Sequence, residues 1–358
     1  MNTRERLHAV FHWKKPDRVP CMDFGYWNET IAAWHSQGLP ETVKTSLDLE
    51  RFLGLEGVET IPFIPVTHGL FPCFDEQVLE DRGDHLIKQD CEGNICEVSK
   101  HNPSIPRYIK FGIETRDDWE RYKAERLDYT RVERVGDVTQ CVAEAHAVGM
   151  PVRFFAGSLY GWLRNWLGLE NFSMALMTDR GWVEEMLDHL TTMTLYFINT
   201  VLPGVAVDAA VWWEDMCYNK GPLMSPALFE ELLVPRYRRV TDELKKYGVD
   251  VNIVDCDGCI YELVPGWIRA GINCMFPIEA AHTDPRKLRE MYGKDILLFG
   301  GVDKRRLIAG KEAIDRELER VADLVSQGGY IPTIDHLVPP DVTFENYLYY
   351  VEQKKKIL

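Results

Sequence analysis

The feature that most constrains the fold of this chain is a regular alternation, from about residue 151 onward, of short apolar runs with longer amphipathic stretches. The runs are rich in β-branched and aromatic residues, which favour strands. We expect strands at residues 152–156, 209–213, 250–254, 272–276, 296–299 and 330–334. Strand and helix patterns that alternate in this way predict repeated βα units, and therefore a parallel sheet.

The stretches between these strands contain helix signals. The longest predicted helix spans residues 226–247, where Ser225 is the expected N-cap and Pro226 occupies the first helical position. Further helices are expected at residues 284–292, 311–326 and 344–355.

The first 150 residues are less regular. One strand is expected at residues 19–24, followed by a helix that contains residues 31–34, and another strand near residues 58–65. Eight strands close a (β/α)8 barrel. No linker, low-complexity tract or repeat divides the chain, so we predict an α/β fold, a (β/α)8 TIM barrel, as one domain over residues 1–358.

Residues 78–98 alternate between apolar and polar side chains on either side of the segment Asp90-Cys91-Glu92-Gly93-Asn94. This pattern predicts a β-hairpin inserted into the barrel. Such an insertion is expected to serve as a lid or a packing flap over one mouth of the barrel.

Charge and composition limit the classes of partner and the compartment. A formal net charge of -15 argues against nucleic acid and anionic membranes as partners. Lys354, Lys355 and Lys356 form a basic run at the C-terminus, which we expect to be a solvated tail. The amphipathic N-terminus lacks the apolar core of a signal peptide, which favours the cytosol. The nine cysteines are expected to be reduced, including the isolated pair Cys256 and Cys259.

Polar residues just past the ends of the predicted strands are the candidates for chemistry, because in a barrel they converge on the active-site face. They are Glu214, Asp215, Asp255, Asp257, Glu279, Asp335 and His336. Carboxylates gathered at one mouth raise one another's pKa unless a cation neutralises them. A divalent metal is therefore expected, with Zn²⁺ favoured because an imidazole takes part.

A structural interpretation competes with this one. Asp257 and Gly258 are a good turn pair, and Asp255 could cap the following segment. For any single residue, the structural interpretation is stronger than the functional one. For the whole set of strand-end residues, the functional interpretation is stronger.

Other segments suggest binding. The run from Gly300 to Arg305 follows a strand and could bind an anion through its backbone N–H groups, or form only a tight turn. Aromatic and cationic side chains beyond strand ends could line a pocket or pack in the core; they are Tyr26, Trp27, Tyr160, Trp162 and Arg164. His282 is a further candidate ligand, of second rank.

With these residues in view, the chain resembles the uroporphyrinogen decarboxylase superfamily, which includes corrinoid-dependent methyltransferases. The resemblance covers most of the chain and is strongest in the segments WEDM (213–216), KGPLMSP (220–226), DCDG (255–258), GGVDKR (300–305) and DHLVPPD (335–341). True decarboxylases carry an N-terminal motif of the type RQAGRY, whose arginines hold substrate carboxylates. The equivalent segment here, CMDFGYW (21–27), has no arginine, which disfavours tetrapyrrole decarboxylation.

Methyltransferases of this superfamily that act on thiols hold zinc with a His-x-Cys pair, often a Glu, and a Cys after the last strand. The resemblance implies that Asp255, Asp257, Glu279 and His336 take these places. Harder ligands make a more electrophilic metal, suited to an oxygen-linked methyl donor.

The activity implied is that of the first methyltransferase of an O-demethylase system. It moves a methyl group, as from an aromatic methyl ether, to the Co(I) of a separate corrinoid protein. Glu214 or Asp215 could position or protonate the leaving oxygen. The expected partners are the corrinoid protein and a small-molecule donor, and a homodimer is left open.

Two alternatives remain from the sequence. One is a metal-free decarboxylase or other lyase that uses the carboxylates together with Arg164, Lys304 and Arg305. The other is a corrinoid or tetrapyrrole carrier, which ranks last because the sequence has no Asp-x-His-x-x-Gly signature.

Overall fold

The computed structural model describes residues 1–57, 61–101 and 106–358. The chain divides into two compact units. The first consists of Met1–Ile64, Val138–Phe155 and Gly204–Leu358, and the second of Pro65–Asp137 and Ala156–Pro203. Residues 58–60, the beginning of the strand expected near 58–65, lie outside the described residues.

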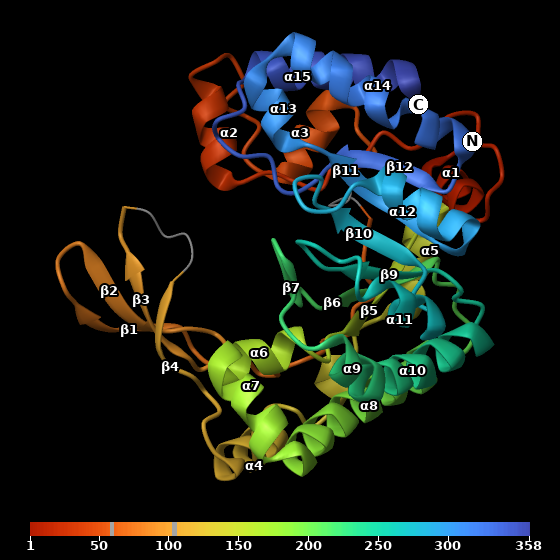
Figure 1. The fold of residues 1–358 in the computed structure, drawn as a ribbon. Coiled ribbons are helices and arrows are strands. Elements are labelled where there is room, and N and C mark those ends of the chain that lie inside the picture. Colours follow the sequence, from red (N-terminus) through yellow and green to blue (C-terminus); the bar gives the residue numbers. More distant parts are fainter. Residues whose placement is uncertain (58–60, 102–105) are drawn as a thin grey trace. The chain divides into compact units, whose positions relative to one another are not determined.

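A six-stranded sheet forms the centre of the first unit (Figure 1). In order across the sheet, its strands are β12 (Tyr330–Ile334), β11 (Leu297–Val302), β10 (Cys274–Ile278), β9 (Asn252–Asp255), β6 (Ala209–Trp213) and β5 (Arg153–Gly157). The pairings from β6 through β9, β10 and β11 to β12 are parallel. The six predicted strands and the predicted α/β class are therefore confirmed.

Short bridges extend this sheet at both edges. Phe63 forms a parallel bridge with Arg153 on β5, within the described part of the strand expected near residues 58–65. Tyr26 forms a parallel bridge with Val338, just after β12. The expectation of a strand at residues 19–24 was wrong, because no ladder forms there. Instead the carboxylate of Asp23 accepts a hydrogen bond of 3.0 Å from the backbone N–H of Ile334 on β12.

Helices surround the sheet, and α13, α14 and α15 lie together beside β11 and β12 (Figure 1). The α-helices of the first unit are α1 (Thr3–Phe11), α2 (Asn28–His35), α3 (Ser46–Leu53), α5 (Val138–Ala147), α9 (Pro226–Leu228), α10 (Val234–Lys246), α11 (Val264–Arg269), α12 (Pro285–Tyr292), α13 (Lys304–Ala309), α14 (Lys311–Gln327) and α15 (Phe344–Ile357).

The long helix predicted at residues 226–247 begins as expected but is not continuous. The hydroxyl of Ser225 accepts a hydrogen bond of 3.2 Å from the backbone N–H of Leu228. A π-helical turn, Phe229–Leu233, then separates α9 from α10. Pro235 lies in the first turn of α10 and has no N–H to donate, which accounts for the change in hydrogen bonding.

The C-terminal helix α15 is tied into the core by a buried ion pair. Lys354 has a fully buried side chain, and its Nζ lies 3.0 Å from Oδ1 of Asp23. The hydroxyls of Tyr347 and Tyr350 donate hydrogen bonds of 2.8 and 3.0 Å to the same carboxylate. The expectation that the three lysines form a solvated tail was therefore wrong for Lys354, which faces inward on its helix.

An antiparallel sheet and several helices make up the second unit. The strands, in order, are β1 (Gln77–Asp81), β2 (His85–Gln89), β3 (Ile95–Ser99) and β4 (Arg107–Lys110). The helices are α4 (Arg116–Glu125), α6 (Gly161–Leu167), α7 (Leu169–Thr178) and α8 (Arg180–Val201). The predicted hairpin is confirmed as β2 and β3, whose turn is held by Asp90 Oδ1 accepting from the backbone N–H groups of Glu92 and Asn94. None of the helices in the described residues combines the length and the hydrophobicity that a membrane-spanning segment requires.

We expect the stability of the fold to depend on pH because of His68, a residue of the second unit. Its buried ring lies 4.7 Å from that of Phe197, and burial, with the nearby charge of Arg134, lowers its pKa to about 3. Unfolding restores a pKa of about 6.5, so the unfolded chain binds a proton that the folded chain does not. The free energy of unfolding is therefore unaffected by His68 above about pH 6.5. Below that pH it falls by up to about 1.4 kcal/mol per pH unit.

Chemical denaturation at pH 6 and pH 4.5 tests this. We expect wild type to lose about 2 kcal/mol more than His68→Gln over this range, since the variant has no imidazole to protonate. Equal losses in the two proteins would contradict a neutral, buried His68.

Candidate active site

The carboxyl ends of the parallel strands bring several of the predicted residues to one edge of the sheet. Trp213, the last residue of β6, is paired with Asp255 on β9, which is paired in turn with Phe276 on β10. The backbone N–H groups of Glu214 and Asp215 both donate to the carbonyl of Asp255, at 2.9 and 3.1 Å. Polar side chains that follow these strands therefore start from neighbouring positions.

Asp215 has an unusual backbone conformation at this edge. Its φ is +39°, in the left-handed region that residues other than glycine seldom adopt. Strained backbone of this kind is concentrated at functional sites, where surrounding structure holds it in place.

Asp257 and His336 form the centre of the candidate site. His336 Nε2 lies 3.4 Å from Asp257 Oδ2, and the two side chains are 28% and 33% exposed. The other oxygen of Asp257 is buried, and it has no hydrogen-bond partner among the described residues. Trp27, 45% exposed, stacks on the His336 ring with centroids 6.0 Å apart. A polar pair that is accessible and bordered by an aromatic ring can hold both a ligand and an apolar substrate.

Asp255 lies beside this pair in an unfavourable environment for a negative charge. Burial, followed by the charges of Asp257 and Asp215, raises its pKa well above the usual range. Either a proton on Asp255 or a bound cation would relieve this repulsion.

Glu279 and Lys304 form a second cluster with Asp335. Lys304 Nζ lies 3.4 Å from Glu279 Oε1 and 3.6 Å from Asp335 Oδ1. The carboxylate of Asp335 also accepts from the backbone N–H groups of Ala280 and Lys304, at 3.0 and 3.1 Å. Burial raises the pKa of Asp335 to about 6. Asp335 thus joins the ends of β10, β11 and β12.

The predicted metal ligands are brought together only in part. Asp257 and His336 meet, whereas Glu279 pairs with Lys304 and accepts a 3.0 Å hydrogen bond from the backbone N–H of Gly258. Over residues 1–57, 61–101 and 106–358, no three His, Cys, Asp or Glu side chains are gathered as a metal-binding group. The unsatisfied oxygen of Asp257 and the repulsion around Asp255 fit a cation held by Asp257 and His336.

The remaining candidates of the first unit are partly structural. Glu214 is completely buried. Burial, followed by the charge of Glu214, raises the pKa of Tyr237 well above its usual range. Tyr26 is buried too, and its hydroxyl lies 2.5 Å from that of Tyr347. His282 Nε2 lies 3.9 Å from Glu279 Oε1. Trp27 is therefore the predicted aromatic residue that borders the candidate site.

Tyr160, Trp162 and Arg164 belong to the second unit, where the two aromatic rings are buried. The ring of Tyr160 lies 5.3 Å from that of Phe172, and Trp162 stacks on Trp166 at 5.7 Å. Within that unit both rings contribute to the core.

Gly300 and Gly301 lie within β11, where they pair with Pro332 and Thr333 of β12, so the expectation of a tight turn was wrong. Close packing explains the first glycine, because a Cβ on Gly300 would lie 2.5 Å from the backbone nitrogen of Ile278, and its φ is +117°. The cations that follow β11 are already paired, Lys304 with Glu279 and Arg305 with Asp303 at 2.7 Å. These pairs do not favour an anion site.

Asp335 was among the residues predicted from the strand ends, and Lys304 was named only in the lyase alternative. Asp335 directly follows β12, and Lys304 lies two residues after β11. The rule that selects polar residues at strand ends does not state which of them pair, so the contact between these two residues was not predicted.

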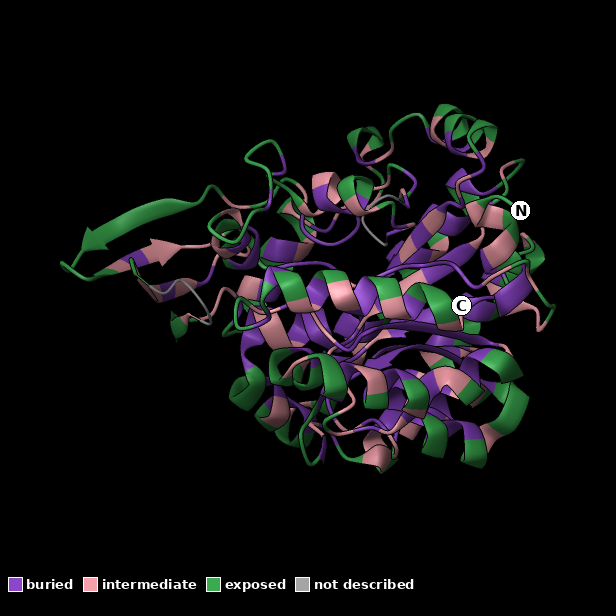
Figure 2. Cartoon of the chain, turned by 90° about the horizontal axis from the view of Figure 1, so that it is seen from above, coloured by how far each residue is buried: buried purple, intermediate pink, exposed green. Residues whose placement is uncertain are grey.

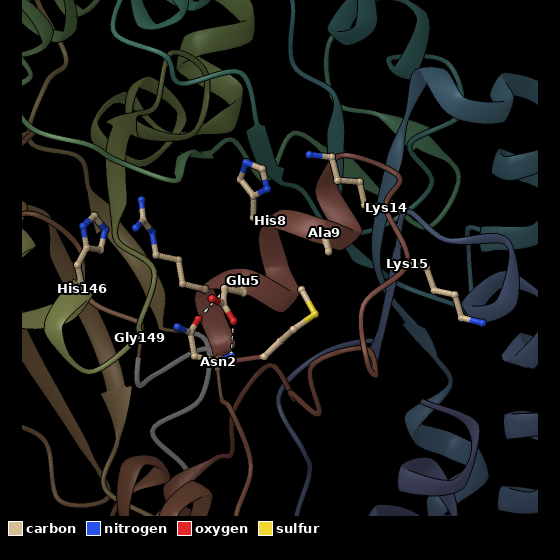
Figure 3. A pocket seen from close by; sticks show the side chains of 10 residues that line it. Asn2, Glu5, His8, Ala9, Lys14, Lys15, His146 and Gly149 are labelled. Carbon is tan, nitrogen blue, oxygen red and sulfur yellow. Dashed lines mark hydrogen bonds between the residues drawn. The ribbon is translucent and has the colours of Figure 1, made fainter.

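A cavity of about 660 Å³ lies at the other end of the strands (Figure 3). Its lining includes Arg4, His8, Lys14 and His146. Arg4 pairs at 2.7 Å with Asp208, which directly precedes β6. Because barrel enzymes act at the carboxyl ends of their strands, this cavity is not the candidate active site.

Comparison with known proteins shows what this chain is similar to. The family model described as uroporphyrinogen decarboxylase (URO-D) matches residues 95–357. A uroporphyrinogen decarboxylase of Citrifermentans bemidjiense is 25% identical over 250 residues, covering 67% of this chain and 70% of that protein. One from Geobacter metallireducens is 26% identical over 171 residues, 47% of each chain. The solved structure of a methyltransferase from Methanosarcina mazei aligns with 99% of both chains, at 14% identity and a TM-score of 0.62.

Proposed function

Because the chain belongs to the uroporphyrinogen decarboxylase family and is an enzyme of that superfamily, we propose that it is a corrinoid-dependent methyltransferase. It would take a methyl group from an oxygen-linked donor, such as an aromatic methyl ether, and pass it to the Co(I) of a separate corrinoid protein. The observation that supports this most is the accessible Asp257 and His336 pair beside Trp27.

The reaction breaks the bond between the methyl carbon and the ether oxygen and forms a cobalt–carbon bond. Co(I) supplies the electron pair of the new bond and becomes Co(III), and the phenolate that leaves takes up a proton. Asp215, two residues after β6, and Asp255, the last residue of β9, would be the donors of this proton. Glu214 is unsuited to this role because it is completely buried.

A divalent metal would be held by Asp257 and His336. When bound, it would supply Lewis-acid polarisation of the donor oxygen, which offsets the poor leaving ability of a phenolate. The exposed ring of Trp27 would orient an aromatic donor against this pair by stacking.

The names of the curated relatives support a second candidate, a decarboxylase. Decarboxylation of a polyacidic tetrapyrrole needs cations that hold carboxylates. Lys304 and Arg305, the cations nearest the strand ends in sequence, are paired with acidic side chains of this chain, and residues 21–27 contain no arginine. These features favour the methyltransferase.

Parallel assays test the two candidates. Purified protein is given guaiacol and cob(I)alamin under anaerobic conditions, and separately uroporphyrinogen. We expect methylcobalamin and catechol from the first mixture, detected by the absorbance of methylcobalamin and by chromatography, and no loss of carboxyl groups in the second. Decarboxylation without methyl transfer would establish the second candidate instead.

A further inference from the structure

The outer strands of the antiparallel sheet, β1 and β4, are unusually accessible. Every residue of both strands is exposed. In Figure 2 one edge strand of this sheet is coloured as exposed along its length. Four are large and apolar: Val78 (55% exposed), Leu79 (50%), Tyr108 (40%) and Ile109 (51%). Nothing in the described part of the chain pairs with the outer side of either strand. Exposed apolar edge strands present unpaired N–H and C=O groups and readily accept another strand.

The two edges carry opposite charges. β1 ends in Glu80 and Asp81, whereas β4 begins with Arg107 and ends with Lys110. If β1 is aligned antiparallel to β4, one register places Val78 and Leu79 opposite Ile109 and Tyr108. The same register places Glu80 opposite Arg107. Apolar and opposite-charge cross-strand pairs both stabilise such an alignment.

Alignment of like edges lacks this complementarity. Two copies of β1 would bring together four carboxylates, and two copies of β4 would bring together four cations; like charges directly opposite one another are destabilising. The charged side chains of the two edges are themselves exposed, so each can leave its present ion pair at little cost. The two side chains of the pair between Glu80 and Arg82 are 54% and 50% exposed, and Arg107, paired with Glu97, is 80% exposed.

We propose that the four-stranded sheet is a pairing surface for a second copy of this chain, in which β1 of one protomer adds antiparallel to β4 of its partner. Register irregularities at Val78/Glu80 and at Ile95/Cys96 leave Leu79 and Ile109 as extra residues on the two edges. Such bulges bend and twist a strand. When both edges of the sheet pair with the same partner, the assembly closes as a dimer and leaves no edge unpaired.

Charge reversal tests this pairing independently of the enzyme's activity. One variant carries Glu80→Lys and Asp81→Lys, and a second carries Arg107→Glu and Lys110→Glu. Sedimentation velocity at micromolar concentration should show a dimer for wild type and a monomer for each variant alone. An equimolar mixture of the two variants should again form dimers, because each reversed edge meets an edge of opposite charge.

The control reverses two exposed acids of α4 in the same unit, Asp117→Lys and Glu120→Lys, and should remain dimeric. Circular dichroism confirms that every variant is folded. A monomeric wild type would overturn the proposal. So would a mixture that stays monomeric, or a β4 variant that remains dimeric by itself, since the last result would indicate pairing between like edges or another surface.

Discussion

Replacing Lys354 with alanine is expected to lower the free energy of unfolding by about 3–5 kcal/mol. The substitution leaves Asp23, 1% exposed, as a buried carboxylate without its cation. Tyr347, Tyr350 and the backbone of Ile334 still donate hydrogen bonds to it, but they do not neutralise its charge. Chemical denaturation followed by circular dichroism measures the loss as a shift of the midpoint.

Lys356→Ala is the matched control, two residues further along the same helix. Its side chain is 59% exposed and pairs with Glu352 at 3.3 Å, so we expect a change below about 1 kcal/mol. The double variant Asp23→Leu with Lys354→Met removes both charges and should recover much of the loss. Similar effects from Lys354→Ala and Lys356→Ala would show that the ion pair does not stabilise the fold.

Asp257→Ala and His336→Ala are expected to abolish metal binding and to slow methyl transfer by at least about 100-fold, because each removes one of the two ligands proposed to hold the metal. Elemental analysis of the purified proteins measures the metal content without any assay of activity. The rate of methyl transfer is measured as the formation of methylcobalamin from guaiacol.

His282→Ala is a close control for His336→Ala, since both imidazoles are 28% exposed and each lies within 4 Å of a carboxylate. It should keep its metal and most of its activity. A wild-type protein that contains no metal yet transfers methyl groups would refute the metal site while leaving the methyltransferase intact. If His282→Ala were the only variant to lose its metal, the metal site would instead be at Glu279.

The sequence was sufficient to predict the parallel sheet and the edge at which the candidate residues lie. Strands such as β9 and β12 are marked by local apolar runs, and a parallel arrangement places the residues that follow them at the same edge. Asp257 and His336 were therefore found together although 79 positions of sequence separate them, and the structure places them 3.4 Å apart.

The sequence did not identify which charged side chains would become buried. Lys354 is one of three consecutive lysines, and only its position on the inner face of α15, in line with Tyr347 and Tyr350, carried a signal. Its partner Asp23 was assigned to a strand, but its carboxylate accepts the N–H that a neighbouring strand would have bonded.

The six strands of the central sheet and the end of that sheet that carries the polar residues could be predicted from the sequence, because hydrophobic periodicity acts over a few neighbouring positions. The tertiary structure alone decided that Glu279 contacts Lys304, that Asp335 joins three strand ends and that Lys354 is buried. These outcomes depend on strand register and on the burial of charges by elements distant in sequence, and neither quantity is encoded in any short segment of the chain.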